Sequence, residues 1–107
     1  MTDTFKKLAQ AQVAASPSTT TLYTVPASTQ TVVRHIRMVN TTGTDRTLKL
    51  WHDGTNNVNV ILPPTTIKAG GWAEFDGTLT FEASDTLISQ ASAGSAITVT
   101  VYGLEVA

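Results

Sequence analysis

The two histidines, His35 and His52, are the residues with the clearest potential for catalysis in this chain, which has no cysteine. A histidine acts as a general base for a serine nucleophile when a carboxylate orients its ring. Serine and aspartate residues are available, but the sequence has no G-x-S-x-G turn to mark one serine as the nucleophile. His35 lies in the middle of an expected strand, between Arg34 and Ile36, and His52 directly precedes a turn. We therefore interpret both histidines as structural and predict that the protein is not an enzyme.

The densest group of possible metal ligands is His52, Asp53, Asn56 and Asn57. A hard cation takes about six to eight oxygen ligands, and the ligand spacing of an EF-hand is not found here. Asx hydrogen bonds within a turn account for the same residue types. We expect a hairpin turn at Asp53-Gly54, with no metal and no cofactor.

Carboxylates gather around one stretch of the chain, at Glu74, Asp76, Glu82 and Asp85. A carboxylate pair is the catalytic unit of most glycosidases. Glu74 and Asp76 alternate with Ala73 and Phe75, as on the solvent-facing side of a strand. Charges on an edge strand also discourage unwanted strand pairing, and this is the interpretation we favour.

Two tryptophans, Trp51 and Trp72, are predicted to point outward. Trp51 alternates with Leu50, and Trp72 alternates with Ala73, so each lies opposite an apolar side. Large exposed aromatics mark interfaces or ligand platforms. Three interpretations stay open: a protein contact, caps over the ends of a sandwich, or a sugar platform.

The elements that must position these residues are short strands, with turn signals about every eight to twelve residues. Such spacing predicts an all-β, single-domain antiparallel sandwich of about eight strands. The expected strands are Thr20–Val25, Thr31–Val39, Arg46–His52, Val58–Leu62, Trp72–Phe75, Leu79–Phe81, Thr86–Ser92 and Ile97–Val106. Pro63-Pro64 is expected to end one strand, and Asp76-Gly77 to form a tight turn.

The segment Leu22–Gly43 has the punctuation of a β-hairpin. Pro26 fixes its own φ and removes an amide donor, so the first strand is expected to end there. The second strand is rich in β-branched residues. Asn40 and Gly43 tolerate the left-handed conformation of a turn and are expected to end it.

Residues 1–16 differ from the rest and are predicted to form an N-terminal arm, followed by a sandwich domain at 17–107. Their apolar residues fit weakly both a helix and an extended arm or edge strand, and we favour the extended form. A frayed terminus is the alternative to an arm that packs on a neighbouring subunit. The residues expected to make that contact are Phe5, Leu8 and Val13.

The composition argues against several classes of partner. A net charge of −1 gives no electrostatic reason for binding nucleic acid or an anionic membrane. No signal peptide or membrane span is expected. Charged residues make up 14% of the chain, against roughly 25% in typical globular proteins. A surface so poor in charge is weakly protected against association and indicates large protein contacts.

Several motifs occur together along most of the chain: Lys7–Gln12, Leu22–Ala27, Val33–Arg37, Asn40–Gly43, Ala69–Trp72 and Ser92–Val106. This combination resembles a family of small virion proteins of tailed bacteriophages. The resemblance implies a jelly-roll-like sandwich that assembles as a symmetric oligomer, with no catalytic residues. It implies a virion protein assembled in the host cytoplasm, most simply a trimeric decoration protein that binds the major capsid protein. A tail, neck or head-fibre component, and a carbohydrate-binding module, are the alternatives.

Overall fold

The computed structural model describes residues 5–106, which fold into two four-stranded β-sheets. One 3-10 turn, η1 (Asn57–Asn59), is the only helical element of these residues, and no helix among them is long and apolar enough to cross a membrane. The strands are β1 (Lys6–Gln12), β2 (Thr20–Thr24), β3 (Gln30–Asn40), β4 (Arg46–His52), β5 (Val60–Ile67), β6 (Trp72–Phe81), β7 (Thr86–Ala91) and β8 (Ile97–Val106).

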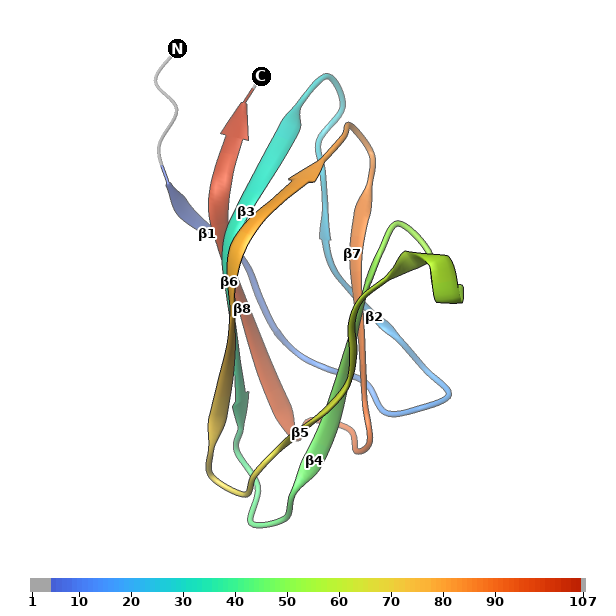
Figure 1. The fold of residues 1–107 in the computed structure, drawn as a ribbon, viewed down its shortest axis with the longest axis vertical. Coiled ribbons are helices and arrows are strands. Elements are labelled where there is room, and N and C mark those ends of the chain that lie inside the picture. Colours follow the sequence, from blue (N-terminus) through green and yellow to red (C-terminus); the bar gives the residue numbers. More distant parts are fainter. Residues whose placement is uncertain (1–4, 107) are drawn as a thin grey trace.

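Sheet A has the strand order β1-β8-β3-β6, and sheet B has the order β2-β7-β4-β5. All neighbours are antiparallel, and the pairs β1–β8, β2–β7, β3–β6 and β4–β5 are nested in the sequence. Nested pairs arise when one long antiparallel ribbon folds over into two packed sheets, which is a jelly roll. Figure 1 shows the sheets as two facing layers. The predicted all-β sandwich is confirmed.

The core lies between the two sheets. Alternate residues of each central strand point inward, and most of these are β-branched or leucine side chains that suit a pleated surface. Each such side chain contributes about 1.5–3 kcal/mol on full burial. The largest fully buried side chains are Val13, Val25, Val33, Ile36, Met38, Leu48, Leu50, Phe81, Leu87, Ile97, Val99 and Val101.

The hairpin predicted for Leu22–Gly43 is wrong. β2 pairs with β7 in sheet B, whereas β3 pairs with β8 and β6 in sheet A. The segment around Pro26 is therefore a crossover between sheets. β3 does end at Asn40 as predicted, but the conformation of the turn differs from the prediction, because neither Asn40 nor Gly43 has a positive φ.

Two other predicted breaks are absent. Asp76-Gly77 is not a turn, because β6 runs unbroken from Trp72 to Phe81 and Asp76 pairs with His35 of β3. β5 also continues through Pro63-Pro64. Proline is tolerated there because β5 is the edge of sheet B and its free side needs no N–H donors.

The N-terminal segment is part of the sandwich from Lys6 onward. β1 is an edge strand of sheet A, paired with β8 from Lys6↔Gly103 to Gln12↔Thr98. This agrees with the interpretation of the segment as an extended arm or edge strand. Residues 1–4 of the predicted arm lie outside the described residues.

Candidate functional site

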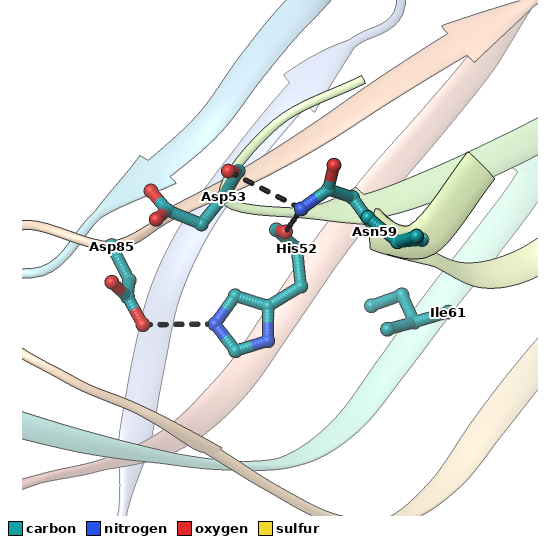
Figure 2. Close-up of a pocket in the computed structure, with 6 residues that line it drawn as sticks. His52, Asp53, Asn59, Ile61 and Asp85 are labelled. Carbon is teal, nitrogen blue, oxygen red and sulfur yellow. Dashed lines mark hydrogen bonds and ion pairs between the residues drawn. The ribbon is translucent and has the colours of Figure 1, made fainter. Parts of the chain in front are cut away.

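A pocket of about 320 Å³ lies at one end of sheet B, where the β4–β5 and β6–β7 connections meet. Figure 2 shows its main feature, the ring of His52 pointing at the carboxylate of Asp85. The His52 Nε2 to Asp85 Oδ2 distance is 2.9 Å. The lining residues are His52, Asp53, Val58, Asn59, Ile61 and Asp85.

The His52–Asp85 pair joins two loops. The hydrogen bond to His52 is the main cause that lowers the pKa of Asp85, and the Glu82 N–H, 3.0 Å from the same oxygen, adds to it. The ring of His52 stacks on that of Phe81 with centroids 4.0 Å apart. The pair therefore fixes the end of β4 against the turn after β6.

The pocket lacks the remaining parts of a catalytic site. Within residues 5–106, no serine or threonine hydroxyl is hydrogen-bonded to His52, and no group of three or more possible metal ligands comes together. Asn59 serves the loop itself: its Nδ2 donates to the His52 carbonyl at 3.0 Å, and its Oδ1 accepts from the Asn56 N–H at 3.2 Å. The turn interpretation of this cluster agrees with this geometry.

His35 belongs to a second polar group, on the outer face of sheet A. Its ring nitrogens lie 3.6 Å from Glu74 and 3.9 Å from Asp76, both on β6. Arg37 is 3.0 Å from Glu74. Its guanidinium also stacks over the ring of Trp72, with 4.4 Å between the guanidinium carbon and the ring centroid. The carboxylates predicted to face solvent do so, in a network with the basic residues of β3.

This outer face also carries the exposed aromatics of the sheet. Trp72 is 57% exposed and Tyr102 39% exposed, while Phe5, just before β1, is 62% exposed. The Arg34 guanidinium lies 6.0 Å from the centre of the Phe5 ring. Within the described residues, Val58 is the other large apolar side chain that is exposed. The face thus combines apolar and charged groups, as protein interfaces do.

The five residues predicted to form contacts between proteins are placed differently from one another. Trp72 points outward as predicted, and Phe5 is exposed, whereas Leu8 is half-buried against the core. Val13 is fully buried, which corrects the expectation that it faces a neighbour. Trp51 lies on the same face of β4 as Lys49, as predicted, but its exposure was not predicted correctly, since its side chain is only 4% exposed.

Trp51 is buried on the outer side of sheet B and not in the core between the sheets. The pairing of β4 with β7 runs without a register shift from Leu48 to His52, so Leu48 and Leu50 face the core while Trp51 shares the opposite face with Lys49. The ammonium of Lys49 lies 5.0 Å from the centre of the Trp51 ring and helps to cover it. The indole N–H is buried and has no hydrogen-bond partner among the described residues.

A network missed in the sequence joins the two sheets near the start of β1. The hydroxyl of Tyr23, on β2, donates to Glu105 of β8 and lies 2.9 Å from the Thr31 hydroxyl of β3. Lys6 forms a 2.7 Å ion pair with Glu105. Burial, followed by the bond to Glu105, raises the pKa of Tyr23 to about 12. The bond from Lys6, followed by that from Tyr23, lowers the pKa of Glu105.

We expect the charge of Glu105 to stabilise the fold in a pH-dependent way. Because its pKa lies below the ordinary 4.5 in the folded state, its contribution is complete above that value and is lost as the pH falls through the lowered pKa. Glu105→Gln should lower the free energy of unfolding by about 1–2 kcal/mol at pH 7. Urea unfolding should show this difference shrinking as the pH falls below about 5. A difference that stays constant with pH would contradict the ionic role.

Comparison with known proteins identifies the fold. No family model matches the chain, and no curated protein sequence is detectably similar to it. A chain of the Bacillus endospore appendages, a family of disulfide-linked pili, superposes with a TM-score of 0.60 at 17% identity, over 97% of this chain and 87% of the other. A chain from the acid-stable capsid of Helicobacter pylori bacteriophage KHP30 superposes with a TM-score of 0.56 at 10% identity, over 99% of both.

A third similar structure comes from the T13 particle of infectious bursal disease virus. It has a TM-score of 0.56 at 12% identity and covers 96% of this chain but 30% of the viral one. At these identities the likeness concerns the fold. The jelly roll of this protein is therefore one that also occurs in viral particles and in pili.

Proposed function

We propose that the protein is a non-enzymatic structural protein of a bacteriophage virion, which decorates the capsid as a homo-oligomer. Its partners are other copies of itself and the major capsid protein, with a trimer as the form suggested by the family resemblance. The observation that carries the proposal is the outer face of sheet A, where Trp72, Tyr102 and Phe5 are exposed beside charged residues. A small jelly roll with such a face is suited to binding proteins.

The similar structures support this proposal. They come from a bacteriophage capsid, a viral particle and a pilus, and each of these is built by repeated protein contacts. The chain corresponds to a whole jelly-roll unit of the phage capsid chain, since nearly all of both chains superpose. The low share of charged residues, 14%, also favours association over solvation.

The mechanism of such a protein is mechanical. Once an oligomer has bound one capsid subunit, its other copies are held close to neighbouring subunits at a high effective concentration. Several weak contacts therefore give a high overall affinity. Binding to the assembled shell, and not to dissociated subunits, stabilises the shell by mass action.

The carbohydrate-binding alternative is weakened by the fold. It relied on Trp51 and Trp72 as aromatic platforms, and Trp51 is buried. A tail, neck or head-fibre role uses the same kind of face and differs only in the partner, so the experiment must separate it from decoration.

We expect phage that lack this protein to assemble full heads that release their DNA at a lower temperature or under milder osmotic shock than wild-type particles. Adding back the purified protein should restore stability, and electron microscopy should locate it on the shell. Particles with normal stability would contradict decoration. Heads without tails, or tails without adsorption, would assign the protein to the neck or tail.

A further inference from the structure

Both edge strands of sheet A, β1 and β6, are free of proline, and the charges on β6, which discourage pairing with an arbitrary strand, still permit pairing with a strand of complementary charge. Within the described residues, the backbone of β1 is hydrogen-bonded only to β8, and that of β6 only to β3. β6 is ten residues long and contains no proline. In sheet B, β5 carries Pro63 and Pro64, and β2 is only five residues long. Each edge of sheet A has one register shift, but both present a longer run of backbone free of proline, to which a further strand can add.

The core-facing side chains at these two edges are apolar and incompletely covered. They pack against the buried core but stay partly exposed, unlike their neighbours Ile36 and Val101 on the inner strands, which are fully buried. A strand added at either edge would complete their burial and contribute about 25 cal/mol for each Å² of apolar surface covered. The residues are Leu8, Ala9 and Ala11 on β1, and Ala73, Phe75 and Leu79 on β6.

The outer side chains at the same edges have opposite charges at the same height. Lys7 of β1 is level with Tyr102 of β8, which is level with His35 of β3 and Asp76 of β6. Lys7 is exposed, and the side chain of Asp76 is 82% exposed. A row that begins with an ammonium and ends with a carboxylate is complementary to the next copy of itself when copies are placed side by side.

We propose that copies of the protein join through sheet A, with β6 of one copy pairing with β1 of the next. Within one sheet β1 and β6 are antiparallel, so rotation about an axis along the strands brings them together as an antiparallel pair. The rows then continue at the same height, with Asp76 against Lys7 of the next copy and Phe75 against Ala9. This rests on the self-association in the proposed function and adds the contact that makes it.

Such a contact is heterologous, because two different edges meet. Repeating this contact gives a closed ring when a whole number of copies completes a full rotation. In such a ring no edge of sheet A is left unpaired.

Engineered disulfides test this contact without background, because the chain has no cysteine. Gln10 of β1 and Glu74 of β6 lie at the same height in the sheet, because Gln10 pairs with Thr100, Thr100 with Arg37, and Arg37 with Glu74. Replacing these two residues leaves Lys7 and Asp76 unchanged. Within one chain they are separated by three strand spacings, about 14 Å, too far for a disulfide. Across the proposed junction they are direct neighbours, about 4.5–5.5 Å apart.

We expect the double variant Gln10→Cys/Glu74→Cys to form covalent oligomers on mild oxidation, in a ladder that ends at the mass of the native oligomer. Each single variant alone should stay uncrosslinked, and an equimolar mixture of the two should give a covalent dimer. The matched control is Gln10→Cys/Thr66→Cys, which uses the proline-bearing edge β5 and should not crosslink. Adding Asp76→Lys should slow crosslinking of the first pair about tenfold at low salt, and Lys7→Glu should restore it.

The outcomes separate the contact from the function. Crosslinking by a single variant alone would mean that like edges meet, which overturns the heterologous contact. An oligomeric mass by light scattering without crosslinking would overturn the β6–β1 pairing and leave self-association intact. A mass that stays at one chain at all concentrations would overturn both.

Discussion

Replacing Gly103 with alanine is expected to destabilise the fold by at least about 3 kcal/mol, because there is no room for a Cβ atom. A Cβ at this position would lie 2.2 Å from the Val32 carbonyl oxygen and 2.9 Å from Leu8 Cδ1. The leucine methyl could move, but the carbonyl oxygen belongs to the backbone of β3. The alanine variant must therefore separate β8 from β3 or change the pairing of both.

The position of Gly103 explains why this site is so tight. It pairs with Lys6 of β1 and with Val33 of β3, and the pairing shifts by one residue just beyond it on both sides, after Lys7 and after Val33. A β-bulge therefore lies beside this glycine in each of the two neighbouring strands. The φ of Gly103 is not positive, so space is the reason for glycine here.

Gly43→Ala is the matched control. A Cβ at Gly43 meets no atom within 4 Å, and its φ is not positive. This substitution should leave stability unchanged or raise it by a few tenths of a kcal/mol, through the lower entropy of the unfolded chain. Midpoints of urea unfolding, compared with equal m-values, measure both variants. A Gly103→Ala protein as stable as wild type would contradict the close approach of β3 and β8.

The strands themselves could be predicted from local sequence because alternation is a local signal. Leu48 and Leu50 are buried as their spacing predicts, and Ala73 and Phe75 face the core opposite exposed Glu74 and Asp76. Local signals do not reveal pairing. In a jelly roll the partners of β1 and β2 lie at the far end of the chain, so Leu22–Gly43 resembled a hairpin while its strands belong to different sheets.

The candidate site was predictable only in part for the same reason. Alternation places both tryptophans on the outer faces of their strands, but only Trp72 is exposed, because the alternation within one strand does not tell which parts of a face are covered. His52 and Asp85 are separated by 33 residues, and Tyr23 and Glu105 by 82. Contacts at such separations depend on the topology, and no spacing rule finds them. The edges of sheet A likewise become visible only once the strand order is known.

The Asn40-Thr41-Thr42-Gly43 turn shows how a correct boundary can have an unexpected cause. Asn40 does end β3, but its side chain and not its backbone conformation makes the turn. It is fully buried, and its amide nitrogen donates to the carbonyls of Thr44 at 2.8 Å and Ile67 at 3.0 Å. Its amide oxygen accepts from the N–H and the hydroxyl of Thr42, at 3.0 and 2.7 Å. One side chain therefore joins the β3–β4 turn to the end of β5.

Asn40→Ala is accordingly expected to cost about 3 kcal/mol of stability, because it removes the donor to the buried Ile67 carbonyl and the acceptor for the half-buried Thr42 N–H. Asn40→Asp keeps the shape and the acceptor but loses both donors and sets a carboxylate against two carbonyl oxygens. It should be at least as damaging at pH 7 and should recover in part at low pH, where a protonated carboxyl donates one bond.

The control for the amide is Asn57→Ala, since Asn57 is exposed and its side chain makes no hydrogen bond within the described residues. Its effect should stay within about 0.5 kcal/mol. Urea unfolding at pH 7 and near pH 4 distinguishes the explanations. If Asn40 acted only through its turn propensity, aspartate, which also favours turns, would be tolerated at both pH values. If both substitutions strongly lower the free energy of unfolding, and acid relieves the loss only for aspartate, then the two hydrogen bonds donated by Asn40 are the cause. This result would show that the turn attaches sheet A to the edge of sheet B.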